Sequence, residues 1–194
     1  MKEKRILIID GHPDSDRSHL VHALADRYAE GAGSGGHDVR RLDIATMDIC
    51  PLSSRREWEQ GDPPAAIAAG QQDILWAEHI VLLYPLWLGD LPALLKAFFE
   101  QVLRPGFAFR YREGRLPEKK LKGRTAHIVV TMGMPALVYR LFYGAHSLKS
   151  LERNILKFVG ITPVRRSIIG NVEGDHDIRD YWLNEMTARG HAGR

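Results

Sequence analysis

The stretch IVLLYPLWLGDLPALLKAFFE, residues 80–100, decides the fold class. It begins with the apolar run 80–84, which predicts a strand buried on both faces of a sheet. A loop with two prolines follows, and Pro92 opens a helix at the first-turn position where proline is tolerated. A buried strand followed by a helix with a wide apolar face is the repeating unit of a parallel α/β sheet.

The same alternation extends along the whole chain. Further strands are predicted over residues 6–9, 39–42, 126–131 and 164–169, and helices after Ser18, over 65–76, over 148–158 and over 177–189. Ser18 is the expected N-cap of the first helix, and the glycine-rich segment 31–36 is interpreted as its stop and a flexible turn. Residues 50–64 are expected to form an irregular excursion, and residues 107–122 and 132–144 to be connections. Five strands with right-handed crossovers predict a single domain, residues 1–194, with a three-layer doubly wound parallel sheet of order 2-1-3-4-5.

Composition excludes several classes of protein. The 194 residues are 44% hydrophobic and 26% charged, which is typical of a globular domain and excludes a disordered chain. Lys and Arg (27) exceed Asp and Glu (24) by three, and they are scattered, so no nucleic-acid partner is expected. The single cysteine, Cys50, excludes an intrachain disulfide framework. No 18-residue apolar run and no signal-like leader is found, so we expect a cytoplasmic protein without membrane insertion.

Ligands of such sheets bind at the carboxyl ends of the strands where the strand order reverses. The first loop at this edge, residues 10–21, joins a buried strand to a helix N-terminus and carries hydroxyls and histidines. Free N–H groups there favour an anion such as a phosphate, although a capped helix after a solvated turn fits the pattern as well. The phosphate motifs GxxxxGK[ST] and GxGxxG are absent from this loop.

Two more loops reach the same edge. In residues 85–92, Trp87 is able to form the wall of a pocket for a flat aromatic ligand, or to be part of the core, and Gly89 permits close approach of a ligand. In the third loop, Thr131 and Gly133 offer donors to ring carbonyls. Tyr143 and His146 lie three residues apart and would share a helix face. They could stabilise negative charge or move a proton, or be a packed tyrosine and a surface histidine.

No metal site is expected from the sequence. His12, His19 and His22 are close in sequence, but no carboxylate or cysteine completes a recognisable ligand set. Cys50 has no partner for redox catalysis. Five aromatic side chains fit either an interface or acceptor pocket or the core: Phe107, Phe109, Tyr139, Phe142 and Tyr143.

Four motifs carry a family resemblance. They are GHP with RSHL (residues 11–13 and 17–20), YPLWLGDLPALLKAFFEQVLRPGFAF (84–109), VVTMGMP (129–135) and FVGITPV (158–164). In this order and spacing they resemble the flavodoxin-like NAD(P)H:quinone oxidoreductases, a family that includes quinone reductases, modulators of drug activity and ancillary oxidoreductases of potassium efflux systems.

The resemblance implies a flavoprotein that passes hydride from NAD(P)H through a non-covalent flavin to a quinone or similar acceptor in a ping-pong cycle. It implies three groups of flavin contacts: His12, Ser18, His19, Leu20 and Val21 around the phosphate and ribityl chain; Leu86, Trp87, Leu88 and Gly89 along the ring edge; and Thr131, Met132, Gly133 and Met134 on the pyrimidine side. Tyr143 and His146 are the candidate catalytic pair that offsets charge on the reduced ring.

Cofactor, assembly and alternative functions follow from the same resemblance. FMN is favoured over FAD, because the chain lacks the long C-terminal extension of the longer quinone reductases. NAD(P)H is the implied co-substrate, and a homodimer with sites at the subunit interface is the implied assembly. Two other functions stay open: a regulatory subunit that docks on a transporter, and a one-electron carrier, against which the net charge of +3 argues.

Overall fold

A computed structural model describes residues 2–174 and 176–194. Its central sheet has five parallel strands in the order β2-β1-β3-β6-β7, so the predicted order is found, with β6 and β7 as the fourth and fifth strands of the sheet. The strands are β1 (Arg5–Asp10), β2 (Asp38–Asp43), β3 (His79–Pro85), β6 (Thr125–Thr131) and β7 (Val164–Ile169).

The register of the strands explains where a ligand site can form. Ile9 of β1 pairs with Leu42 of β2 on one side and with Leu82 of β3 on the other. Tyr84 of β3 pairs with Val130 of β6. Because the strands are parallel and in step, the loops after Asp10, Pro85 and Thr131 leave the sheet at one edge.

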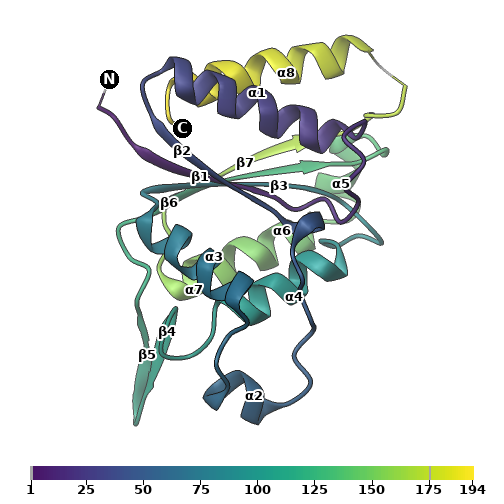
Figure 1. Cartoon of the computed structure of the whole chain (residues 1–194). Helices are drawn as coiled ribbons and strands as arrows, with labels where there is room; N and C mark the ends of the chain where they lie inside the picture. The colour runs from purple at the N-terminus through teal and green to yellow at the C-terminus, as the bar shows by residue number, and fades with distance from the viewer. Residues whose placement is uncertain (1, 175) are drawn as a thin grey trace.

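Helices cover both faces of the sheet. Figure 1 shows α1 and α8 on one face and α3, α4, α6 and α7 on the other. The helices are α1 (Leu20–Ser34), α2 (Arg55–Gln60), α3 (Ala65–Trp76), α4 (Ala93–Val102), α5 (Ala136–Leu141), α6 (His146–Ser150), α7 (Lys157–Val159) and α8 (His176–His191), with a 3-10 turn η1 (Ile44–Thr46) and a π-helical segment η2 (Leu151–Leu156). Alternate residues of β1 face the two layers: Leu7 and Ile9 pack in the larger core, and Ile6 and Ile8 pack under α1 and α8. None of the helices in the described ranges combines the length and the apolar composition needed to span a bilayer.

The glycine-rich segment 31–36 does end α1 and form a turn, as the sequence indicates, but its first four residues are helical. Helix α1 continues through Gly31 and Gly33 and ends at Ser34. A Cβ atom at Gly31 would lie 2.0 Å from the backbone oxygen of Thr187 in α8, and one at Gly190 of α8 would lie 2.1 Å from the oxygen of Tyr28. These glycines therefore let two helix backbones pack in direct contact, and the sequence pattern alone did not show this partner.

The connections are more ordered than the sequence predicted. Residues 50–64 contain α2, which is held by the buried Arg104 through its hydrogen bonds to the carbonyl oxygens of Glu57 (2.9 Å) and Gly61 (2.7 Å). Residues 107–122 contain an antiparallel hairpin, β4 (Phe109–Arg112) and β5 (Arg115–Lys119). The expected helix 148–158 is instead the run α6-η2-α7, and Gly160 ends it with a φ of +110°, as predicted.

Candidate functional site

A cavity of about 410 Å³ lies at the carboxyl edge of the sheet. It is formed by the start of α1, the ends of β3 and β6 and the segment around the start of α8. Ten of the predicted contact residues line it together: His12, Ser18, His19, Leu20, Val21, Leu86, Trp87, Thr131, Met132 and Gly133. Leu88, Gly89 and Met134, which were also predicted, are not among its lining residues.

The start of α1 differs from the sequence prediction. The N-cap is His19, not Ser18, and no side chain of the described residues caps the helix. The N–H groups of the first turn have no intrahelical acceptor, so those of Leu20 and Val21 are available to a ligand. They carry the positive end of the helix dipole, and both residues line the cavity. The geometry therefore suits an anion.

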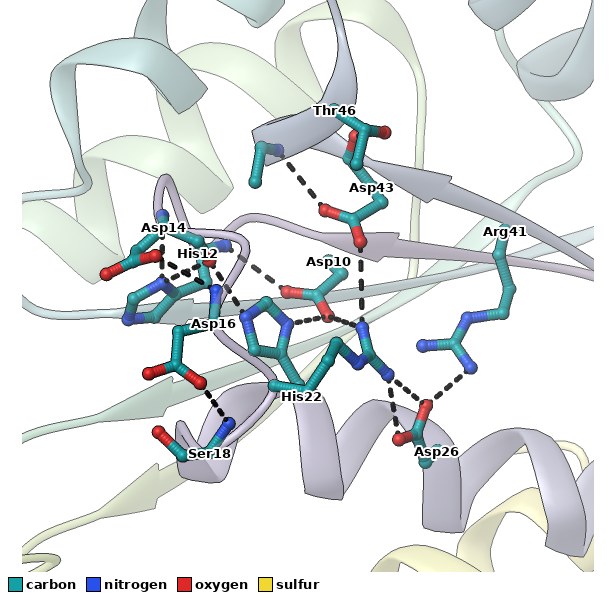
Figure 2. A network of polar contacts seen from close by, with 12 residues as sticks. Asp10, His12, Asp14, Asp16, Ser18, His22, Asp26, Arg41, Asp43 and Thr46 are labelled. Atoms are coloured by element: carbon teal, nitrogen blue, oxygen red, sulfur yellow. Dashed lines mark hydrogen bonds and ion pairs between the residues drawn. The ribbon is translucent and has the colours of Figure 1, made fainter.

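The loop before α1 has no regular secondary structure, and its own side chains define its shape. Carboxylate oxygens accept hydrogen bonds from the N–H two residues further on: Asp10 from His12 (3.3 Å), Asp14 from Asp16 (2.9 Å) and Asp16 from Ser18 (3.0 Å). Figure 2 shows these bonds around the turn. Such Asx turns hold the carboxylates against the loop backbone.

Charge in this loop is balanced locally. Burial lowers the pKa of His12, and His19 and His22 nearby lower it further. The N–H of Asp16 and the ring of His19 hold the pKa of Asp14 below its usual range. The rings of His12 and His19 stack with centroids 4.1 Å apart, and both residues line the cavity.

Trp87 and Asp90 close a two-residue turn through mutual backbone hydrogen bonds of 2.9 Å. The two central residues have positive φ angles, +47° for Leu88 and +78° for Gly89. Gly89 is thus explained by the turn, which needs a left-handed residue, rather than by close approach of a ligand. The indole of Trp87 is half exposed and meets the ring of His12 edge-on at 5.9 Å, so it belongs to the cavity wall and not to the core.

The third loop places donors beside Trp87. Thr131 and Met132 are buried at the end of β6, and the N–H of Met132 is already bonded to Ile169. Within the described residues, the Gly133 N–H and the Thr131 hydroxyl have no protein partner. Met134 packs against the core instead.

Four lining residues were missed by the sequence analysis: Pro85, Val172, Glu173 and Arg179. The last three belong to the segment after β7, whose carboxyl end lies at the same edge of the sheet. Inspecting the loop after the fifth strand would have found them, and Arg179 brings a cation to the cavity.

Tyr143 and His146 do not share a helix face, contrary to the prediction. Tyr143 lies in a turn after α5, and Ala145, with a φ of +48°, separates it from His146 at the start of α6. Neither residue lines the cavity, although both are exposed. Of the other aromatic candidates, Phe109 and Tyr139 are core residues, whereas Phe142 is 81% exposed.

One group of possible metal ligands was not expected from the sequence. Asp10, His22 and Asp43 bring ligand atoms within 4.8 Å of one another. The guanidinium of Arg17 lies 3.9 Å from Asp10 and 3.6 Å from Asp43, so both carboxylates already face a cation of the chain. The pair of carboxylates therefore has a counter-ion without a metal.

A comparison with family profiles decides the classification. The profile described as "Flavodoxin-like fold" matches residues 4–188. The chain belongs to this flavodoxin-like family. The family predicted from the motifs is thereby confirmed.

Relatives of this flavodoxin-like chain are oxidoreductases by name. It is 31% identical over 170 residues to an uncharacterized NAD(P)H oxidoreductase of Haemophilus influenzae, covering 86% of this chain and 83% of the relative. It is 29% identical over 189 residues to the FMN-dependent NADH:quinone oxidoreductase of Nitratidesulfovibrio vulgaris, covering 84% and 85%. The solved NAD(P)H:quinone oxidoreductase of Methanothermobacter marburgensis superposes over the full length of both chains with a TM-score of 0.83 at 24% identity, which supports the fold.

Proposed function

We propose that this protein is an FMN-dependent NAD(P)H oxidoreductase that reduces quinones or similar electrophiles. The observation that carries the proposal is the edge cavity, where an uncapped helix start, an indole and a donor-bearing loop meet. The names of its relatives agree with this activity.

The cavity has the donors that a flavin phosphate needs. We assign the phosphate to the N–H groups of Leu20 and Val21 and to the hydroxyl of Ser18, with His19 beside them. Arg179, which lines the same cavity, adds positive charge from α8. FMN rather than FAD remains our assignment, and it agrees with the name of the Nitratidesulfovibrio relative.

The ring would lie between Trp87 and the third loop. Bound FMN supplies the hydride chemistry between nucleotide and acceptor. The indole gives the ring an apolar face, while the Thr131 hydroxyl and the Gly133 N–H offer hydrogen bonds to polar ring atoms. Thr131 is buried at the end of β6, so its position is set by the sheet, and Gly133 follows two residues later.

NAD(P)H and the acceptor are proposed to occupy the open side of the cavity one after the other, in a ping-pong cycle. Tyr143 and His146 remain the proposed pair that offsets negative charge on the reduced flavin ring. Both are exposed and lie in and just after the turn before α6. Substitution of His146 by Gln is then expected to slow flavin reduction by NAD(P)H in stopped-flow absorbance traces. Unchanged reduction kinetics would remove His146 from the mechanism.

The assembly is proposed to be a homodimer. Several large apolar side chains are exposed at the turn 87–90 and along α5 and the following turn: Leu88, Leu137, Leu141, Phe142 and Tyr143. Exposed apolar surface of this kind marks interaction sites. Sedimentation equilibrium should give twice the chain mass, and a monomer at micromolar concentration would exclude this assembly.

Purified protein tests the proposed function. Reconstitution with FMN should give a yellow protein whose absorbance is bleached by NADH or NADPH under anaerobic conditions and restored by benzoquinone. Flavin binding without oxidation of either nucleotide would reject the activity, and failure to take up flavin would reject the site as well.

A further inference from the structure

His22 is buried in the first turn of α1, directly beneath the loop that precedes the helix. Its ring does not line the cavity, and the proposed function gives it no role. Burying a polar ring completely is unfavourable unless both nitrogens find partners. In Figure 2 the ring of His22 lies between Asp10 and the loop backbone.

Both nitrogens of His22 face acceptors. Nδ1 lies 2.6 Å from a carboxylate oxygen of Asp10, and Nε2 lies 2.9 Å from the backbone oxygen of Asp14. The ring of His22 therefore bridges the buried Asp10 carboxylate and the backbone of the loop.

This bridge holds the loop residues that line the cavity. The backbone of Asp14 is held on both sides of its Cα atom. Its carbonyl oxygen contacts Nε2 of His22, and its N–H donates to Nδ1 of His12 (3.1 Å). His12 in turn stacks on His19, whose Nε2 contacts the Asp14 carboxylate at 3.2 Å. A chain of direct contacts thus leads from the buried His22 to two rings at the cavity wall.

The contact between His22 and Asp10 also bears on the negative charge of the loop. Asp10, Asp14 and Asp16 bring three carboxylates to a helix start that is proposed to bind an anion. Asp10 is contacted by the ring of His22 and by the guanidinium of Arg17, and the other two accept hydrogen bonds from the loop backbone. Without His22, the Asp10 carboxylate would lose a buried contact, and the Asp14 carbonyl would keep only its contact with Nδ1 of His12.

We propose that His22 is a positioning residue that, by bridging the Asp10 carboxylate and the Asp14 backbone, holds the 12–19 loop in the conformation that accepts the cofactor phosphate. The proposal rests on the proposed function, because it assigns a phosphate to this loop. It predicts that His22 affects recognition of the phosphate and leaves recognition of the ring unchanged.

Riboflavin, which lacks the phosphate, separates these two effects. Dissociation constants of FMN and riboflavin would be measured by quenching of flavin fluorescence for the wild type and for H22Q. We expect the FMN constant to rise at least about tenfold in H22Q and the riboflavin constant to stay within about twofold. H127Q is the matched control: His127 is also buried, with one hydrogen bond to Ser167, but it lies away from the cavity. Equal losses for both ligands, or no loss for either, would overturn the proposal.

A second measurement uses the unliganded wild-type protein and needs no variant that folds. Its NMR spectrum should show a hydrogen-bonded ring N–H proton of His22 that exchanges slowly with solvent. A His22 ring proton that exchanges as fast as that of an exposed histidine would overturn the bridge to Asp10. If the wild type binds neither flavin, the proposed function fails; if it binds FMN no better than riboflavin, the phosphate assignment fails. Both outcomes differ from a failure confined to H22Q.

Discussion

Replacing Leu20 by proline removes one backbone N–H at the start of α1 while the helix can still form. Leu20 is the first helical residue, where the N–H has no intrahelical acceptor and proline is well tolerated. The preceding residue, His19, has φ −70° and ψ 138°, which is the extended conformation that a following proline requires. The substitution therefore deletes a proposed phosphate donor without breaking the helix.

The expected loss follows from the strength of a hydrogen bond to a charged group, about 1.5–3 kcal/mol. This corresponds to an FMN dissociation constant that is roughly 10- to 100-fold higher. Leu20 also packs in the core beneath α1, so L20A serves as the matched control, because it shortens the side chain and keeps the N–H. Circular dichroism would confirm that both variants fold.

The comparison of L20P with L20A shows whether the N–H of Leu20 contacts the phosphate. L20P should bind FMN far more weakly than L20A, while riboflavin should bind both variants alike. Equal FMN constants for L20P and L20A would show that this N–H does not contact the phosphate, and the assignment of the helix start would be wrong.

Three other outcomes are expected. W87A should raise the FMN dissociation constant about tenfold through loss of ring contact, measured by fluorescence titration; unchanged affinity would remove Trp87 from the site. G31A should lower the free energy of unfolding by on the order of 3 kcal/mol, because its Cβ would meet the Thr187 backbone. The control G33A, whose Cβ would have nothing within 4 Å, should be neutral or stabilising. Equal denaturation midpoints for the two variants would contradict the close helix contact. Burial lowers the pKa of His127 to about 3, so the unfolded chain, protonating near 6.5, binds more protons at low pH. Stability should therefore fall by about 2 kcal/mol between pH 7.5 and pH 5, and H127Q should remove this part of the slope, as chemical denaturation at both pH values would show.

The sheet was predictable from the sequence because its strands are buried on both faces. Residues 6–9 and 80–84 are continuous apolar runs, and in a small α/β protein such short runs are typical of strands that are covered on both faces. Strand order followed from the chain topology. The helix contact at Gly31 was not predictable, because a glycine that admits a neighbouring backbone looks the same in sequence as a glycine that ends a helix.

The site, like the fold, was predictable where it depends on the strand ends and not where it depends on backbone angles. The edge loops could be located from the ends of three strands, and ten of the expected residues do line one cavity. The cap at His19, the turn at Leu88 and the break at Ala145 depend on backbone angles that no residue pattern specified. The Asp10–His22 pair joins residues twelve positions apart across a loop without regular structure, so no periodicity indicates it.

A crystal structure of the protein with FMN would show where the cofactor binds. We expect the phosphate at the N–H groups of Leu20 and Val21, with the ring between Trp87 and the loop 131–133. FMN bound at any other surface, with the edge cavity closed by side chains, would contradict this expectation.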